Sequence, residues 1–146
     1  TRSFHAIISV LLIIVHLGQE VIMFIIDLSS RLAIYEQIVQ QVEEGILKGL
    51  LKPEEQLPSV RALSLELALN PNTVSKAYTE LERRGIIYTA VGKGCFIAKD
   101  AHSIISQKLT ASFTEFLQQV KKYKTAGVPA EKLISLIQQL YKEETQ

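Results

Sequence analysis

The stretch LNPNTVSKAYTELERRG, Leu69 to Gly85, decides how the rest of this sequence is interpreted. It predicts a helix that begins after Asn70, with Pro71 in the first turn and Gly85 as the C-terminal stop. One small polar side chain is enough to cap a helix, yet Asn72 and Thr73 follow immediately. This excess of polar side chains indicates that the start of the helix meets something outside the protein.

A second helix lies directly before this one. Ser59 follows Pro58 and is a good N-cap, so we expect a helix from about residue 60 to residue 69. Its inward residues would be Val60, Leu63, Leu67 and Ala68. Further upstream, residues 33–50 form another predicted helix with an apolar stripe of Ile34, Ile38, Val42, Ile46 and Leu50. Two helices joined by a turn of a few residues have the spacing of a helix-turn-helix.

A short hairpin is predicted after Gly85. Residues 86–89 and 95–98 have the pattern of two strands, and Gly92-Lys93-Gly94 would form the tip between them. A helix-turn-helix followed by a β-hairpin is the outline of a winged helix. The predicted fold class is therefore mainly α with a small β-hairpin (α+β).

This order of elements favours binding to DNA. A recognition helix enters the major groove with its N-terminal end first, where free N–H groups and the helix dipole favour phosphate. Asn pairs with adenine, and Thr contacts a base or a thymine methyl group. Residues 59–99 contain six basic and three acidic side chains, a net charge of +3 in a chain whose total is +1.

Each of these features also has an ordinary structural explanation. Asn70 and Pro71 alone make a common helix cap, and the two glycines at the hairpin tip are common turn residues. Arg83 and Arg84 would complement the dipole at a helix end. Tyr78 would be a core residue and Cys95 a half-buried strand residue. The indication of DNA binding comes from the order of the pieces, not from any one of them.

The segment LPSVRALSLELALNPNTVSKAYTELERRGIIYTAVGKGCFI resembles the GntR-type winged helix. That family has an LPS-x-R motif, then N-x-x-T-V, then an L-E-x-x-G stop and a glycine-flanked wing. The resemblance covers residues 31–99, and the short tail after it is similar to the YtrA subfamily. It implies a DNA-binding transcriptional regulator, more often a repressor, and an operon of the ABC-transporter type as its target.

The resemblance also implies roles for individual residues. Residues at the start of the second helix would hold the DNA backbone, namely Ser59 and Arg61. The recognition positions would be Asn70, Asn72, Thr73, Ser75 and Lys76, and the wing tip would be Lys93 and Gly94. Many relatives have arginine where this chain has Pro71 and Ser75, and Lys93 replaces a common arginine. Lysine lacks the planar fork of arginine, so this chain would depend more on phosphate contacts and on its Asn and Thr side chains.

Residues 101–146 have the pattern of two amphipathic helices separated by Gly127-Val128-Pro129. The first carries a near-heptad seam of Ile105, Leu109, Phe113, Phe116, Val120 and Tyr123, and the second carries Leu133, Ile137 and Leu140. Two such helices cannot bury both apolar faces alone, so they need a partner, which is either the first domain or a second copy of the chain. We therefore expect a two-helix dimerisation segment and a homodimer whose two recognition helices meet a palindromic operator.

The N-terminal segment, residues 1–22, is unusual. Its apolar run from Ala6 to Val15 is half the length of a transmembrane helix, and no cleavage site typical of a signal peptide follows it. The residues before Met23, Gln19-Glu20-Val21, can be encoded by a bacterial ribosome-binding sequence. We expect residues 1–22 to be translated upstream sequence, and a membrane-tethered regulator remains the alternative.

The sequence argues against several other classes of protein. It has a single cysteine and three widely spaced histidines, so neither a disulfide framework nor a metal site is expected. No paired carboxylates, nucleophile and base, or phosphate-binding loop indicate an enzyme, and no cofactor is expected. The prediction is a bacterial, cytoplasmic regulator whose partners are double-stranded DNA and a second copy of itself. A winged helix that binds protein, and an unidentified small-molecule effector, remain open.

Overall fold

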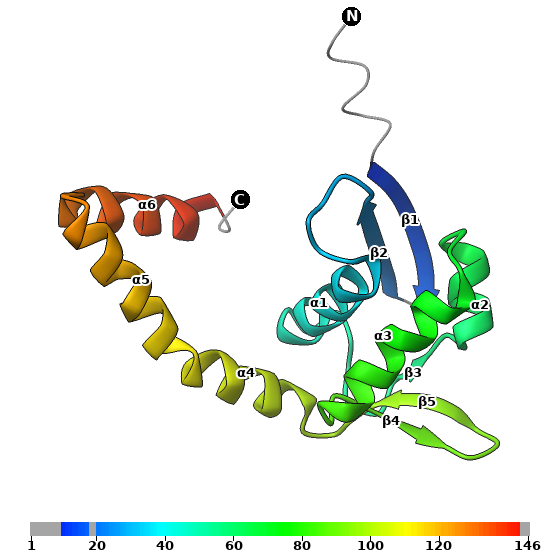
Figure 1. Ribbon diagram of the computed structural model, residues 1–146. Helices are drawn as coiled ribbons and strands as arrows, with labels where there is room; N and C mark the ends of the chain where they lie inside the picture. The colour runs from blue at the N-terminus through cyan, green and yellow to red at the C-terminus, as the bar shows by residue number, and fades with distance from the viewer. Residues whose placement is uncertain (1–9, 18–19, 144–146) are drawn as a thin grey trace, which may run out of the picture. The chain divides into compact units, whose positions relative to one another are not determined.

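The computed structural model describes residues 10–17 and 20–143, with side chains from Phe24 onward. The chain divides into two compact units, Thr1–Gln107 and Lys108–Gln146. The first unit contains a helical domain with two small sheets, and the second contains the end of one helix and the two helices that follow it (Figure 1).

The helix-turn-helix is confirmed. The structure contains α1 (Ile34–Leu47), α2 (Val60–Glu66) and α3 (Pro71–Arg83). The Ser59 hydroxyl caps α2 by accepting a hydrogen bond from the Ala62 N–H at 3.1 Å. Fully buried residues of the three helices meet in one core that includes Val42, Leu63, Val74 and Leu81.

Two inward positions were predicted wrongly. Leu50 is 46% exposed, and Leu51 is buried in its place, because α1 ends at Leu47 and Gly49 turns the chain with a φ of 73°. Ala68 is exposed and has a φ of 51°, because it forms the turn between α2 and α3 instead of continuing α2.

The wing contains one strand more than predicted. The expected hairpin is β4 (Ile87–Ala90) and β5 (Gly94–Ile97), and β3 (Gln56–Leu57) pairs with the other edge of β5. All pairs are antiparallel and the order is β3-β5-β4. Gly85, with a φ of 75°, ends α3 and sends the chain into β4, as its place in the sequence predicted.

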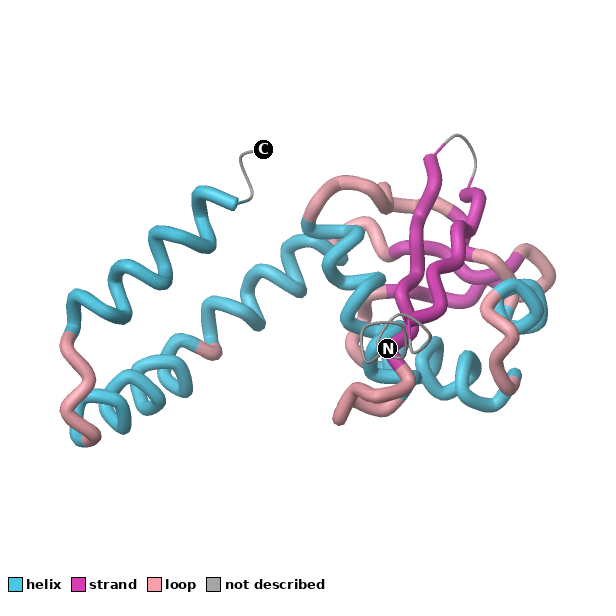
Figure 2. The backbone as a smooth tube through the Cα atoms, turned by 90° about the horizontal axis from the view of Figure 1, so that it is seen from above, coloured by secondary structure: helices cyan, strands magenta, loops and turns pink. Residues whose placement is uncertain are grey.

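A second sheet precedes α1. The antiparallel strands β1 (Val10–Leu17) and β2 (Glu20–Asp27) lie side by side in Figures 1 and 2. Phe24 and Ile26 of β2 are buried in the main core. Met23 lies inside β2, and the origin of residues 1–22 stays a prediction.

Two glutamines of α1 hold β2 by its backbone. The Gln41 amide accepts from the Ile25 N–H at 2.7 Å and donates to the Ile25 carbonyl at 2.8 Å. Gln37 makes the same pair of bonds with Asp27, each 2.9 Å long. The two side chains lie one turn apart and bond every second residue of β2, as a neighbouring strand would.

The C-terminal helices are α4 (Ala101–Ala111), α5 (Phe113–Thr125) and α6 (Ala130–Glu143). The first predicted helix is thus divided at Ser112, whose hydroxyl donates to the Leu109 carbonyl at 2.7 Å. Ile105, the predicted start of the seam, is only 4% exposed and packs in the core of the first unit. Among the helices of the described ranges, none is both long enough and apolar enough to cross a membrane.

Candidate nucleic-acid interface

The N-terminal turn of α3 carries one side chain that caps the helix and other polar side chains that make no hydrogen bond within the described residues. Asn70 is the cap, since its Oδ1 accepts from the Asn72 N–H at 2.8 Å. Asn72 and Ser75 are exposed, and Thr73 is half-buried. Within the described part of the chain, the side chains of Asn72 and Ser75 make no hydrogen bond. This turn therefore presents free polar groups at the positive end of a helix dipole.

Lys76 lies one turn further along α3 and is held by an aromatic ring. Its Nζ lies 3.9 Å from the centre of the Tyr35 ring, a cation–π contact between α3 and α1. Tyr35 itself packs against the main core. The ring fixes the position of the ammonium group without neutralising its charge.

The start of α2 carries the two other predicted backbone contacts. Ser59 is occupied as the cap of α2. Arg61 is exposed and, among the residues that the structure describes, its guanidinium forms no ion pair. Of these two residues, Arg61 is the one that offers an uncompensated charge.

Both arginines at the end of α3 are paired internally. Arg83 and Arg84 each contact the Glu80 carboxylate at 2.7 Å, and Arg84 also reaches Glu43 of α1 at 2.8 Å. Hydrogen bonds from the two guanidinium groups lower the pKa of Glu80 to about 2. These contacts tie α3 to α1, and they favour the structural explanation of the two arginines over a contact with DNA.

The wing tip carries Lys93 on a closed turn. The Lys93 N–H donates to the Ala90 carbonyl at 3.0 Å, and Gly92 occupies the third turn position with a φ of 73°. This is the position where a type II turn requires a positive φ. Lys93 and Gly94 are both exposed.

A pocket of about 320 Å³ lies between the wing and the helices α2 and α3. Its lining includes Ser59, Ser75, Thr79, Thr89 and Cys95. Burial raises the pKa of the Cys95 thiol, so the thiol stays protonated at neutral pH. The buried Tyr78 hydroxyl donates to the Pro58 carbonyl at 2.7 Å and locks α3 to the start of α2. Tyr78 is thus a core residue, as the sequence predicted.

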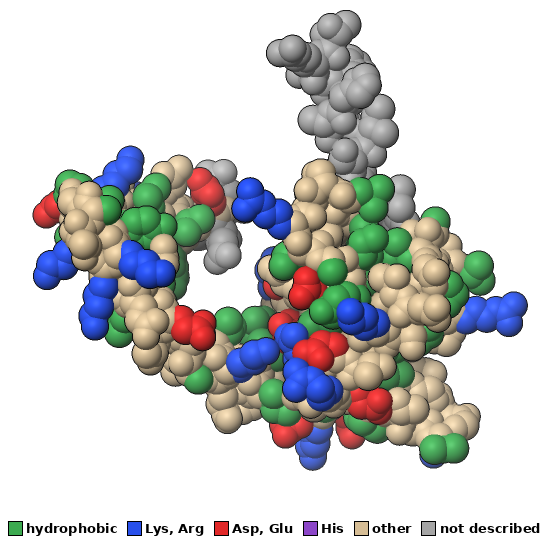
Figure 3. Space-filling view, viewed as in Figure 1, with side chains coloured by type: hydrophobic (Ala, Val, Ile, Leu, Met, Phe, Trp, Pro, Cys, Tyr) green, Lys and Arg blue, Asp and Glu red, His purple; other side chains and the backbone are tan. Residues whose placement is uncertain are grey.

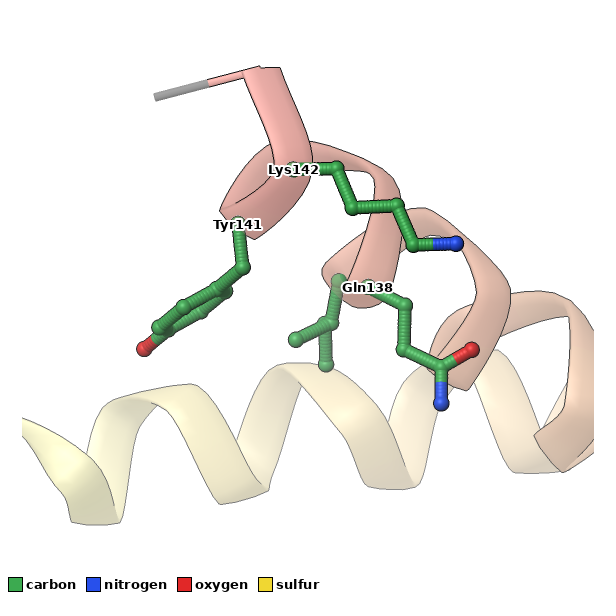
Figure 4. Close-up of a pocket in the computed structure, with 4 residues that line it drawn as sticks. Gln138, Tyr141 and Lys142 are labelled. Carbon is green, nitrogen blue, oxygen red and sulfur yellow. The ribbon is translucent and has the colours of Figure 1, made fainter. Parts of the chain in front are cut away.

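The second unit presents apolar side chains to solvent. In Figure 3, hydrophobic side chains lie among lysines on the visible face of these helices. A pocket of about 680 Å³ is lined by Ile137, Gln138, Tyr141 and Lys142 (Figure 4). Val120 and Leu133 are half-buried, and the exposed large apolar residues are Leu109, Phe113, Phe116, Leu117, Tyr123, Ile134, Leu136, Ile137, Leu140 and Tyr141.

Residues 34–97, which include the helix-turn-helix and the wing, match the family described as bacterial regulatory proteins, gntR family. Over 116 residues the chain is 46% identical to the HTH-type transcriptional repressor YtrA of Bacillus subtilis (strain 168), which covers 79% of this chain and 89% of that relative. The chain belongs to the GntR family. It is a DNA-binding transcription regulator with a winged helix-turn-helix, and the resemblance to YtrA-type regulators is confirmed.

Other GntR-related proteins agree with this assignment. The uncharacterized HTH-type transcriptional regulator YhcF of B. subtilis (strain 168) is 36% identical, with 72% of this chain and 87% of the relative covered. A crystal structure described as a transcriptional antiterminator from Listeria monocytogenes EGD-e is 40% identical with a TM-score of 0.66, covering 83% of this chain and 88% of that one. A GntR family regulator from L. monocytogenes is 30% identical with a TM-score of 0.63, covering 76% and 97%. Two of these relatives are named as transcriptional regulators and one as a transcriptional antiterminator, and none is named as an enzyme.

Sequence reasoning missed two residues that organise this surface. Tyr35 contacts Lys76 from another helix, and Gln56 bonds the wing tip from β3. Neither contact leaves a periodic signal, because each joins residues 37 or more positions apart. The two-residue strand that carries Gln56 is also too short to show an alternating pattern.

Proposed function

We propose that this chain is a repressor that binds a palindromic operator as a homodimer. The N-terminal turn of α3 carries the proposal: Asn72, Thr73 and Ser75 stand at its positive end, and two of these side chains make no internal hydrogen bond in the described chain. Buried contacts occupy the opposite face of α3, including Val74, so the polar face is the one left to meet DNA.

Basic side chains at three places support the same orientation. Arg61 at the start of α2, Lys76 on α3 and Lys93 at the wing tip are all exposed. We assign Asn72 and Thr73 to base edges, because the N-terminal end of a recognition helix enters the major groove. We assign Arg61 and Lys93 to phosphates, because Arg61 lies at the start of the supporting helix α2 and Lys93 at a loop tip, away from the end of α3 that enters the groove. We assign Lys76 to a phosphate as well, since lysine is a point charge without the planar fork of arginine.

The second unit supports the homodimer. Ten large apolar side chains are exposed along its described helices, far more than the scattered apolar residues of an ordinary monomer surface. Pairing with the same unit of a second chain would cover them and place two recognition helices on one operator. The B. subtilis relative is named a repressor, and the YtrA-type resemblance points to a transporter operon as the regulated target.

A DNA-binding titration tests this proposal. The full chain is titrated against duplexes from its own upstream region and against a random duplex of equal length, at several salt concentrations. We expect tight, salt-dependent binding to one upstream duplex that contains an inverted repeat, and weaker binding to the random one. Equal affinity for both duplexes, or binding without salt dependence, would contradict the proposal.

A further inference from the structure

Gln56 makes a hydrogen bond to the backbone of the wing tip. It lies in β3, and its Nε2 donates to the Lys93 carbonyl at 2.9 Å. The Lys93 N–H is already bonded to Ala90 across the turn, so both backbone groups of Lys93 are held. One of these bonds comes from within the hairpin and the other from outside it.

Gly94 provides the space in which the Gln56 side chain lies. A Cβ added to Gly94 would lie 2.6 Å from the Gln56 Nε2, which is closer than real contacts allow. Gly94 also has a φ of 119°, a conformation that other residues rarely adopt. Glycine at this position therefore leaves room for the Gln56 amide and also allows the backbone conformation of the turn.

The strand register explains how the two residues meet. Gln56 is paired with Phe96 of β5, and Gly94 lies two residues before Phe96 on the same face of that strand. Diagonal neighbours of this kind are within reach of a long side chain. In Figure 1, β3 lies beside β5, with β4 beyond it, so the Gln56 amide reaches the tip of the β4–β5 hairpin from the β3 side.

A short hairpin tip has few other restraints. Val91, Gly92, Lys93 and Gly94 are all exposed, and none of them contributes to the core cluster. Two glycines in this turn increase its conformational freedom. Without the Gln56 amide, the Lys93 ammonium would sample a wider range of positions before it meets a phosphate, and ordering it on binding would weaken the contact.

We propose that Gln56 is a positioning residue for the wing, which fixes the turn so that Lys93 is preorganised for a DNA phosphate. The inference rests on the proposed function, because it requires that the wing meets DNA. It assigns to the β3 residue a role in binding through Lys93, without direct contact with the DNA.

A double-mutant cycle in the full-length chain tests this inference. The proteins are the wild type, Gln56→Met, Lys93→Ala and the double variant, and methionine keeps the length of the side chain but cannot donate. Each is titrated against the upstream duplex at several salt concentrations. We expect Gln56→Met to bind about fivefold more weakly, in line with the loss of one hydrogen bond. The double variant should bind no more weakly than Lys93→Ala alone.

Two further measurements separate positioning from loss of folding. NMR relaxation should show larger-amplitude motion at residues 91–94 in Gln56→Met, with the helices unchanged. Gln40→Met is the matched control, because Gln40 makes an exposed hydrogen bond with Glu44 on α1, and it should leave both the motion and the binding as in wild type. The inference is overturned if Gln56→Met unfolds more easily than wild type and weakens DNA binding by the same factor whether or not Lys93 is present.

The remaining outcomes are also decisive. If Lys93→Ala weakens binding while Gln56→Met binds like wild type, the inference fails and the proposed function stands. If Lys93→Ala itself binds normally, the inference fails again, and the effect of Thr73→Ala on the same duplex then shows whether α3 still reads DNA. A wild-type chain that binds no DNA would refute the proposed function directly.

Discussion

At the scale of single residues, the charged side chains of the winged helix fall into two groups. Arg83 and Arg84 are bound to carboxylates, whereas Arg61 and Lys93 form no ion pair within the described residues. The first group stabilises the domain and the second is available to a ligand. The sequence separated the two groups by their position, but it did not identify Glu80 and Glu43 as the partners of Arg83 and Arg84.

The pairing of Glu80 makes stability depend on pH. Its pKa is about 2 in the folded chain because of the hydrogen bonds from Arg83 and Arg84, and about 4.3 is usual for an unfolded glutamate. The stabilisation is therefore complete above about pH 5 and is lost as the pH falls toward 2. We expect Glu80→Gln to unfold at lower urea concentration than wild type at pH 7, with the difference vanishing near pH 2. Glu66→Gln, which removes an exposed carboxylate on α2, is the control and should change the urea midpoint little at pH 7.

The residues proposed to contact DNA also fall into two groups, those that contact phosphates and those that contact bases. Arg61→Ala and Lys93→Ala should weaken the operator and random DNA in parallel and lower the salt slope by about 0.9 for each lost phosphate contact. Thr73→Ala should instead reduce the difference in binding free energy between the operator and random DNA by roughly 1–3 kcal/mol. Titrations on both duplexes at several salt concentrations distinguish the two. The assignment is wrong if Arg61→Ala removes only the preference for the operator.

At the scale of elements, local chemistry made the helix-turn-helix predictable. Capping residues, Pro71 and Gly85 marked the ends of α3, and the spacing of Val74, Ala77, Tyr78 and Leu81 gave its buried face. Elements held by distant contacts were not predictable. No periodic signal marks β3, and the attachment of β2 depends on glutamines that lie 10 to 16 residues away along the chain. The seam likewise did not reveal that Ile105 belongs to the core of the first unit.

The attachment of β2 to α1 leads to a test of stability. Gln37 is 7% exposed and makes three hydrogen bonds, with the Asp27 N–H, the Asp27 carbonyl and the Leu32 carbonyl. Gln37→Met would leave these backbone groups without their partner, so we expect a loss of about 1–3 kcal/mol in the free energy of unfolding. Urea denaturation measures it. Gln40→Met, on the exposed side of the same helix, should change stability by less than about 0.5 kcal/mol. Equal effects of the two substitutions would show that the amide pairing does not hold β2.

At the scale of the whole molecule, the division into two units places the folded core in the first unit and the expected dimerisation surface in the second. Ala101 and Ile105 complete the core of the first unit, so a truncation after Lys99 would open that core. The boundary at Gln107 keeps both of these residues. It removes the last four residues of α4 together with α5 and α6, in which no described residue is buried. Independent folding of the first unit is thus compatible with loss of the dimer.

Sedimentation of a chain ending at Gln107 tests this separation of roles. We expect the full chain to be a dimer and the truncated chain to be a folded monomer, with its helical circular dichroism reduced only by the missing helices. Operator affinity should fall steeply, because each monomer can then occupy only one half-site, whereas affinity for random DNA should fall much less.

Two substitutions on α6 refine the test. Ile137→Lys introduces a charge into the apolar face and should give a monomer. Ser135→Lys, on the opposite side of the helix, should leave the dimer intact. A dimer that survives both the truncation and Ile137→Lys would place the pairing surface in the first unit instead.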